Sequence, residues 1–280
     1  MEKIIISEED VIKKYNELKN IHKVAEYFNV SIGPIKRILK FGGVDLTNRR
    51  YEVNHNFFDI IDSESKAYWL GFLFADGYIR ERKSGNSLEL KLSYKDKEHI
   101  ELFKETINSN HKITDGYNQV KYKDKTSSAR MLHLAIYSLR LVNSIKKQGV
   151  HSRKTFTITK PNIDKTLIPH FIRGYFDGDG SFSFNIDTHA NKTNFACASK
   201  EFRQFLIDEL LDNDIELKWY GGMKLYIQNK VDNIKFYSYI YENATVFLKR
   251  KKEKYEEFRR FLDRKSTRLN SSHVSESRMP

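Results

Sequence analysis

The chain has 280 residues, of which 49 are Lys or Arg and 37 are Asp or Glu, so its formal net charge is +12. Apolar residues make up 39% of it, including 19 Phe and 16 Tyr, which is enough to bury a core and excludes a chain disordered throughout. The longest apolar run, residues 67–75, is far shorter than the ~20 residues that cross a bilayer. The single Cys197 excludes an internal disulfide framework and a cysteine-rich zinc module.

The N-terminus lacks the apolar segment and the cleavage site of a signal peptide. We therefore expect a soluble, intracellular protein without a membrane partner. A positive charge of this size favours a polyanionic partner such as nucleic acid, because bound cations are released from the polyanion. Many basic chains are merely soluble, so the charge alone decides nothing.

Residues 8–40 predict a small helical unit with apolar side chains at helical spacing. Residues 29–31 predict a tight turn, in which Ser31 would be the N-cap of a second helix that runs to about Lys40. The pattern resembles a helix-turn-helix, and the alternative is a helical cap with a solvated basic face. The second helix would present three cations to a major groove: Lys36, Arg37 and Lys40.

The domain boundaries follow from composition. We expect a helix-turn-helix-like domain over residues 1–45 and a polar linker over 46–56, in which Arg49 and Arg50 would contact phosphates. Two half-domains would follow, over 57–155 and 156–264. Residues 265–280 carry Ser, Arg and Asn without periodicity, which predicts a disordered or artefactual tail.

From residue 57 onward the chain repeats a pattern. Trp69-Leu-Gly-Phe-Leu-Phe-Ala-Asp-Gly77 and Ile172-Arg-Gly-Tyr-Phe-Asp-Gly-Asp-Gly180 align on their Asp-Gly ends, with Asp76 and Asp179 103 residues apart. Each motif precedes two alternating segments, a helical segment, two further strands and a helix; Asp115-Gly116 is expected as a turn, and 231–262 as one long helix. The fold class expected is therefore α+β, with two pseudo-symmetric αββαββα half-domains.

Each motif is expected to be a buried helix. Four small residues, spaced four apart in each motif, would let the two helix backbones approach closely: Gly71, Ala75, Gly174 and Gly178. Gly77 and Gly180 are suited to a left-handed residue that ends a helix. Asp76 and Asp179 then lie at the negative end of the helix dipole, which costs about 0.3–1 kcal/mol each. A divalent cation between the two carboxylates removes this cost, so the pattern indicates a metal site.

The two motifs resemble the paired signature helices of the LAGLIDADG homing endonucleases, in the single-chain form that carries both. The resemblance spans residues 55–262 and extends to Gly149-Val-His-Ser-Arg-Lys154, His170-Phe-Ile-Arg-Gly174 and Leu248-Lys-Arg-Lys251. It implies a monomeric, site-specific endonuclease for double-stranded DNA, in the host cell of a mobile element, a phage or an organelle. It also implies Mg²⁺ or Mn²⁺, 3′ overhangs, a long asymmetric site and saddle-shaped antiparallel sheets in the major groove.

By position, the resemblance makes Asp76 and Asp179 the catalytic metal ligands, with the backbone carbonyls of Ala75 and Gly178 as further ligands. The family usually has a lysine where a strand gives way to the next helix, a place that Lys230 takes in the second half. The first half has Leu139 there, which departs from the family pattern. Asp177 is interpreted as structural, or as a support for the ligands.

Outward-facing strand residues are the candidates for DNA contacts, although polar residues that only face water are an equal alternative for any one of them. These candidates are Glu89, Lys91, Ser183, Asn185 and Asp187.

Two alternatives remain. Asp76 with Glu89 and Lys91 fits the loose D…E-x-K pattern of restriction-type nucleases, but this leaves the second motif unexplained. The same fold also serves in RNA splicing maturases and in DNA-binding regulators that do not cleave. Such proteins commonly lack one or both motif acids, whereas this chain keeps both.

Overall fold

The structure is a computed structural model that describes residues 6–18, 20–44, 51–82, 85–122, 125–152, 154–185, 188 and 190–276. Of residues 120–122, 125–127 and 263–276 it describes the backbone only. The chain divides into two compact units, Met1–Arg50 and Tyr51–Pro280. No helix within the described residues is long and apolar enough to cross a membrane.

The N-terminal unit holds three short helices around a core of its own. They are α1 (Glu8–Leu18), α2 (Ile21–Tyr27) and α3 (Ile32–Phe41). Asn20 starts α2 by accepting hydrogen bonds from the backbone N–H groups of His22 and Lys23. Asn29 has a φ of 51°, which turns the chain tightly between α2 and α3. Ser31 is the N-cap of α3, as expected, although its side chain makes no capping hydrogen bond.

The first half of the larger unit has the expected αββαββα order. Its elements are α4 (Glu64–Ala75), β1 (Gly77–Arg80), β2 (Ser87–Ser93), α5 (Lys97–Thr106), β3 (Ile113–Tyr122), β4 (Lys125–Ile136) and α6 (Leu139–Lys147). The strands form an antiparallel sheet in the order β1-β2-β4-β3. Leu88, Leu90 and Leu92 alternate on the face that α5 covers, so the residues between them lie on the open face.

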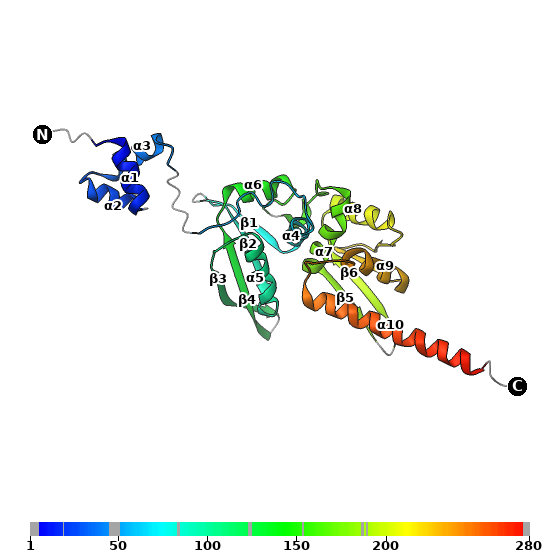
Figure 1. The fold of residues 1–280 in the computed structure, drawn as a ribbon. Helices are drawn as coiled ribbons and strands as arrows, with labels where there is room; N and C mark the ends of the chain where they lie inside the picture. Colours follow the sequence, from blue (N-terminus) through cyan, green and yellow to red (C-terminus); the bar gives the residue numbers. More distant parts are fainter. Residues whose placement is uncertain are drawn as a thin grey trace. The chain divides into compact units, whose positions relative to one another are not determined.

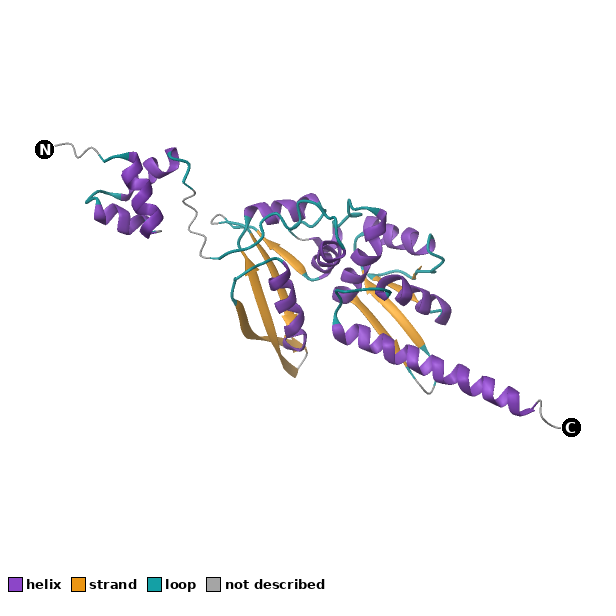
Figure 2. Ribbon diagram, in the orientation of Figure 1, coloured by secondary structure: helices purple, strands orange, loops and turns teal. Residues whose placement is uncertain are grey.

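The second half repeats the order. Its elements are α7 (Ile168–Asp179), β5 (Gly180–Phe184), β6 (Asn191–Ala196), α8 (Lys200–Leu211), β7 (Lys218–Trp219), β8 (Lys224–Ile227), α9 (Lys230–Tyr241) and α10 (Lys249–Glu276). Its sheet has the order β5-β6-β8-β7, which is equivalent to that of the first sheet. The helices α4 and α7 lie side by side between the two sheets (Figures 1 and 2). The expected α+β fold with two half-domains is therefore confirmed.

The expected turn at Asp115-Gly116 is wrong. Both residues lie inside β3, where Asp115 pairs with Leu132 and Gly116 with Met131. The Asp115 side chain is held by an ion pair with Arg130 of the neighbouring strand. This cross-strand pair outweighs the weak strand propensity of Asp and Gly.

The single helix expected over 231–262 is also wrong, because α9 ends at Tyr241 and α10 begins at Lys249. Asn243 has a φ of 55°, a left-handed conformation that a helix interior does not allow. At its far end α10 continues to Glu276, so helix covers part of the segment expected to be a disordered tail. Residues 265–276 contain no Gly or Pro, and a helix that is already formed extends at little cost.

Candidate active site

The two motif helices touch backbone to backbone. A β-carbon on Gly71 would lie 1.9 Å from the carbonyl oxygen of Phe171, and one on Gly174 would lie 1.9 Å from that of Tyr68. Farther along, a β-carbon on Gly178 would lie 2.3 Å from the Cβ of Ala75. All four small residues of the two motifs therefore lie at this contact, and any larger side chain there would separate the halves.

Gly77 and Gly180 serve a different purpose from the one expected. Neither has a positive φ, and that of Gly180 is −82°. A β-carbon on Gly77 would lie 2.6 Å from the carbonyl oxygen of Leu73, and one on Gly180 would lie 2.1 Å from the Phe176 ring. These glycines let a strand leave directly from the last turn of each helix. The expectation of a left-handed backbone conformation is therefore wrong: glycine is needed because a β-carbon would not fit.

The two motif carboxylates meet at the end of the paired helices. Asp76 is the C-cap of α4, and Asp179 is the last residue of α7. The Oδ2 atom of Asp76 lies 3.2 Å from the place of a β-carbon on Gly178, the residue before Asp179. Burial first, and then the charge of Asp179, raises the pKa of Asp76 to about 6. Burial also raises the pKa of Asp179.

Two half-buried lysines lie at the ends of the same helices. Lys154 Nζ donates to the carbonyl oxygens of Leu73, Phe74 and Ala75, each at 2.6 Å. Lys251, near the start of α10, donates from Nζ to the carbonyl oxygens of Phe176 and Gly180 at 2.6 Å and of Gly178 at 3.4 Å. The ammonium groups thus sit where the helix dipoles are negative and where the carboxylates need a counter-charge.

The four side chains form one electrostatic unit. The charges of Lys154 and Lys251 oppose the rise in the pKa of both carboxylates. Burial in turn lowers the pKa of Lys154 to about 7 and that of Lys251 to about 8. Two carboxylates and two ammonium groups, contributed by both halves, therefore share one partly buried place.

Asp177 has a structural place next to this unit. Its carboxylate accepts hydrogen bonds from Tyr68 Oη at 2.8 Å, from Tyr241 Oη at 2.6 Å and from the backbone N–H of Leu248 at 2.6 Å. These donors come from α4, from α9 and from the segment that leads into α10. Asp177 thereby fixes the approach to Lys251, and its burial raises its pKa.

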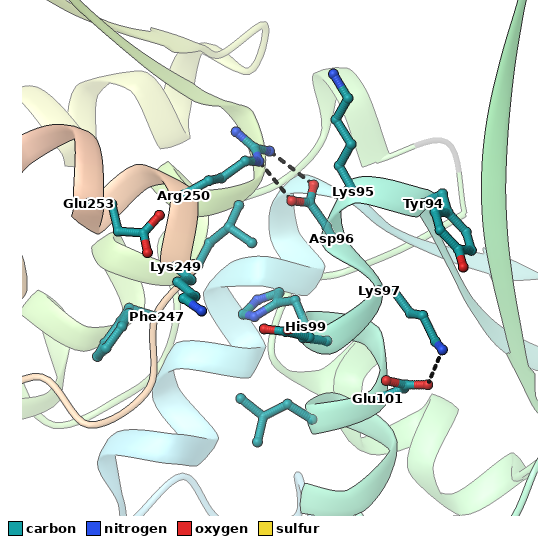
Figure 3. Close-up of a pocket in the computed structure, with 13 residues that line it drawn as sticks. Tyr94, Lys95, Asp96, Lys97, His99, Glu101, Phe247, Lys249, Arg250 and Glu253 are labelled. Carbon is teal, nitrogen blue, oxygen red and sulfur yellow. Dashed lines mark hydrogen bonds and ion pairs between the residues drawn. The ribbon is translucent and has the colours of Figure 1, made fainter.

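An ion pair joins the halves beside the site. Arg250 donates to Asp96 through Nε at 2.7 Å and Nη2 at 3.1 Å (Figure 3). Asp96 precedes α5 in the first half, whereas Arg250 lies in α10 of the second half and is followed by Lys251. A bidentate pair of this kind fixes orientation. It therefore helps to hold the start of α10, and with it Lys251, against the first half.

The residues fit a divalent cation. Carboxylates and backbone carbonyls are the oxygen ligands that Mg²⁺ prefers, and two like charges held together favour a cation between them. Within the described residues no three or more His, Cys, Asp or Glu side chains form a metal cluster, so Asp76 and Asp179 are the two carboxylates that the site offers. The carbonyls of Ala75 and Gly178, expected as further ligands, accept from the two lysines instead.

Lys230, expected as a catalytic residue, lies exposed at the first position of α9. It is not among the charged groups that act on Asp179, whose cationic neighbours are Lys154 and Lys251. Both of these lysines belong to segments that resemble the family, but the sequence patterns assigned them no role. Their spacing could have revealed them, since Lys154 follows Asp76 by 78 residues and Lys251 follows Asp179 by 72.

The expected DNA-contacting residues divide into several groups. Lys36, Arg37 and Lys40 are exposed on α3, and Lys91 and Ser183 are exposed on the open sheet faces. Asn185 is the exposed residue that follows β5, and Arg49, Arg50 and Asp187 lie outside the described residues. The expected DNA contact by Glu89 is wrong, because this residue is buried in an ion pair with Arg80 and so presents no free carboxylate to DNA. The sequence patterns did not single out four open-face residues of the second sheet, namely Lys192, Lys218, Lys224 and Tyr226.

No protein-family model matches the chain, and no curated protein matches it either. Among solved structures, the chain is similar to the homing endonuclease I-WcaI bound to its DNA recognition sequence, with 16% identity over 65% of this chain and 82% of that one, at a TM-score of 0.48. It is similar to the LAGLIDADG meganuclease I-AabMI bound to uncleaved DNA, with 13% identity over 74% and 92% of the two chains, at a TM-score of 0.45.

A third similar structure is the N-terminal LAGLIDADG domain of DUF199/WhiA, with 16% identity over 69% of this chain and 90% of that one, at a TM-score of 0.44. The family that the two motifs resemble is thus also the family of these solved structures. At this level of identity the similarity concerns the fold, and a function has to be sought in the carboxylates, the lysines and the sheet faces.

Proposed function

We propose that the chain is a site-specific double-strand DNA endonuclease that hydrolyses one phosphodiester on each strand with Mg²⁺ or Mn²⁺. The observation that carries this proposal is the meeting of Asp76 and Asp179, one from each half, beside Lys154 and Lys251. A contact that only joins the two helices accounts for the glycines, but it gives no reason to hold two half-buried like charges at the negative ends of two helices.

The roles of the residues follow from their places. Asp76 and Asp179 would hold the divalent cation, which supplies Lewis-acid activation of a phosphate and of a water molecule when bound. Lys154 and Lys251 add positive charge on either side of the carboxylates and attract the phosphodiester that carries the opposite charge. Because each half supplies one acid and one lysine, the site is matched to one scissile bond on each of two strands.

Double-stranded DNA is the proposed partner of the open sheet faces. The second sheet exposes Lys192 and Lys224 on that side, together with Lys218, which is paired with Glu216, and Tyr226, whose ring lies 4.3 Å from Lys192 Nζ. Cations at this density suit a phosphate backbone, and strands fit the major groove. We propose a long asymmetric site, because the two faces carry different residues, and 3′ overhangs by the family resemblance.

The N-terminal unit is proposed as an additional DNA-binding module. Ile35 and Leu39 of α3 are buried against the other helices, which leaves Lys36, Arg37 and Lys40 on the exposed side. This is the arrangement of a recognition helix, packed on one side and basic on the other. We propose that the protein acts as a monomer, since one chain contains both halves of the site. We also propose that it acts in the cell that holds its target.

One observation favours a second candidate, a DNA-binding or RNA-binding protein on the same fold that does not cleave. The carbonyls of Ala75 and Gly178 are hydrogen-bonded to lysines, so ammonium groups already occupy part of the place expected for a metal. The retention of both acids argues for the nuclease.

The test is selection of cleaved duplexes from a random library by the full chain with Mg²⁺, repeated with Asp76→Asn. We expect a defined cut site with the unaltered chain only. Binding of a defined duplex without a cut, equal in both proteins, would support the second candidate. Recovery of the same defined cut site with Asp76→Asn would show that Asp76 is not needed for cleavage and would contradict the proposed site.

A further inference from the structure

A buried carboxylate lies on the otherwise open face of the first sheet. Glu89, in the middle of β2, has 4% of its side chain exposed, although its neighbour Lys91 on the same face is exposed. It accepts from Arg80 Nε at 2.6 Å and Nη2 at 2.9 Å, and from Ser87 Oγ at 3.2 Å, and His133 Nε2 lies 3.2 Å from it. Three neighbours thus hold Glu89, and Glu89 in turn fixes Arg80.

The hydrogen bonds leave one edge of Arg80 available. A guanidinium has five N–H donors in a planar fork. Glu89 takes the edge formed by Nε and Nη2, so the end formed by Nη1 and the second N–H of Nη2 points away from it. This end presents two parallel donors, which is the pattern that matches the O6 and N7 acceptors of guanine in the major groove. The Arg80 side chain is 36% exposed, whereas Glu89, which lies on its other edge, is 4% exposed.

The charge of the pair favours a base over a phosphate. The Glu89 carboxylate carries the charge opposite to that of Arg80, and attraction to a phosphate depends on the net charge of the pair. Directed hydrogen bonds to a base edge do not need that net charge. Lys91 and the lysines of the second sheet remain for the backbone.

The position of Arg80 in the strand sets the distance to the active site. Arg80 is the last residue of β1, four residues after Asp76. At about 3.3 Å per residue this is roughly 13 Å along the strand. Since base pairs are spaced by about 3.4 Å, this corresponds to about four base pairs from the scissile phosphate.

Resting on the proposed function, we infer that Arg80, held by Glu89, selects a guanine about four base pairs from the cleavage position in the half of the target bound by the first sheet. Arg80 is the specificity-determining residue, and Glu89 is a positioning residue that never touches the DNA.

The test measures binding, so that it does not depend on cleavage. The full chain with Asp76→Asn would be used to select bound duplexes from a random library, and the base preference at each position would be compared with that of the same protein carrying Arg80→Ala. We expect one guanine preference to fall by about 5- to 150-fold while the preferences at other positions stay. Arg80→Lys, which keeps the charge but lacks the two-donor edge, should lose the same preference and retain non-specific affinity.

Two variants serve as controls. Glu89→Gln keeps the shape but removes the charge that orients Arg80, so the same position and no other should relax. Arg130→Ala removes another arginine that is ion-paired with a carboxylate, Asp115, but its alternation with Leu132 and Leu134 places it on the α5 side of the sheet. It should leave every base preference unchanged.

The outcomes separate this inference from the proposed function. Uniformly weaker binding by Arg80→Ala, with unchanged base preferences, would mean a phosphate contact and would overturn the inference while leaving the nuclease proposal intact. A guanine preference that survives both Arg80→Ala and Arg80→Lys would do the same. If no duplex is enriched by any of the proteins, the proposed function fails, and the inference fails with it.

Discussion

Lys154 and Lys251 occupy equivalent places in the two halves, each with its ammonium group on the last carbonyl oxygens of one motif helix. Lys154 reaches α4 from a short 3₁₀ turn (Lys154–Phe156), whereas Lys251 reaches α7 from α10. Different elements therefore deliver the same charge to equivalent positions. The pseudo-symmetry of the site extends beyond the two acids that the motifs contain.

The first prediction concerns these lysines. Lys154→Met and Lys251→Met should each lower the rate of DNA cleavage by about 10²- to 10³-fold, as does the loss of one group that stabilises transition-state charge. Lys230→Met is the comparison, because Lys230 is exposed at the start of α9. Single-turnover cleavage of the selected duplex measures all three. A large loss for Lys230→Met, with Lys251→Met unimpaired, would return the catalytic role to Lys230.

Asp76→Asn should make the metal-free protein more stable near neutral pH. The pKa of Asp76 is about 6 in the folded chain and 3.8 in the reference state, so the folded state holds the proton more tightly. The contribution of Asp76 to the unfolding free energy should therefore rise as pH falls from 7 to 4, opposite in sign to that of His99 below, and Asp76→Asn should gain at most about 3 kcal/mol at pH 7.

Urea denaturation with a chelator at pH 7 and pH 4.5 measures this gain. The advantage of Asp76→Asn should shrink at the lower pH. A variant that is less stable than the unaltered chain at both pH values would show that the carboxylate is not under electrostatic stress.

Gly71→Ala should strongly destabilise the larger unit, because the new methyl group would overlap the Phe171 carbonyl oxygen. Overpacking typically costs about 1–3 kcal/mol, and backbone contact on both sides leaves little room for relaxation. The control is Gly116→Ala, where no atom lies within 4 Å of the new carbon. Chemical denaturation compares the two. Equal stability of both variants would mean that the helices can separate at no cost.

His99 should make the stability depend on pH. Burial lowers the pKa of His99 to about 4, below the ordinary 6.5, so the unfolded state binds its proton first as pH falls. The stabilisation is present above pH 6.5 and is lost towards pH 4, with a loss of about 2 kcal/mol between pH 7 and pH 5.

His99→Gln should remove this part of the pH dependence, since its amide can still bond to Tyr68 Oη, which lies 2.9 Å from His99 Nε2. Denaturation curves at pH 7 and pH 5 test this expectation. The same slope with pH in both proteins would assign the dependence to other groups.

The proposed role of the N-terminal unit predicts a change in salt dependence. If all three exposed cations of α3 contact phosphates, replacing Lys36, Arg37 and Lys40 with Ala should reduce the slope of log affinity against log salt by about 2.7. The cleaved sequence should stay the same, because the larger unit holds the catalytic site. Binding titrations at several salt concentrations measure the slope, and an unchanged slope would leave this unit without a phosphate contact.

Local chemistry made much of the fold predictable. The apolar run before Asp76, the two Asp-Gly ends and the alternating strands specify buried helices and half-open sheets without reference to distant residues. The errors lie where a neighbour outweighs local preference. Arg130 keeps Asp115 inside a strand, and the chain breaks at Asn243 to bring α10 and Lys251 back to α7.

The sequence by itself determined the repeat, the paired motif helices and the two acids, because each depends on spacing within a single segment. Only the tertiary structure decided which cations serve those acids and which strand residues are free. Lys154 and Lys251 come from different elements. Glu89 is not free because it forms an ion pair with Arg80 of the neighbouring strand. Charges interact through distances in space, and residues that lie far apart in the chain become neighbours only when it folds.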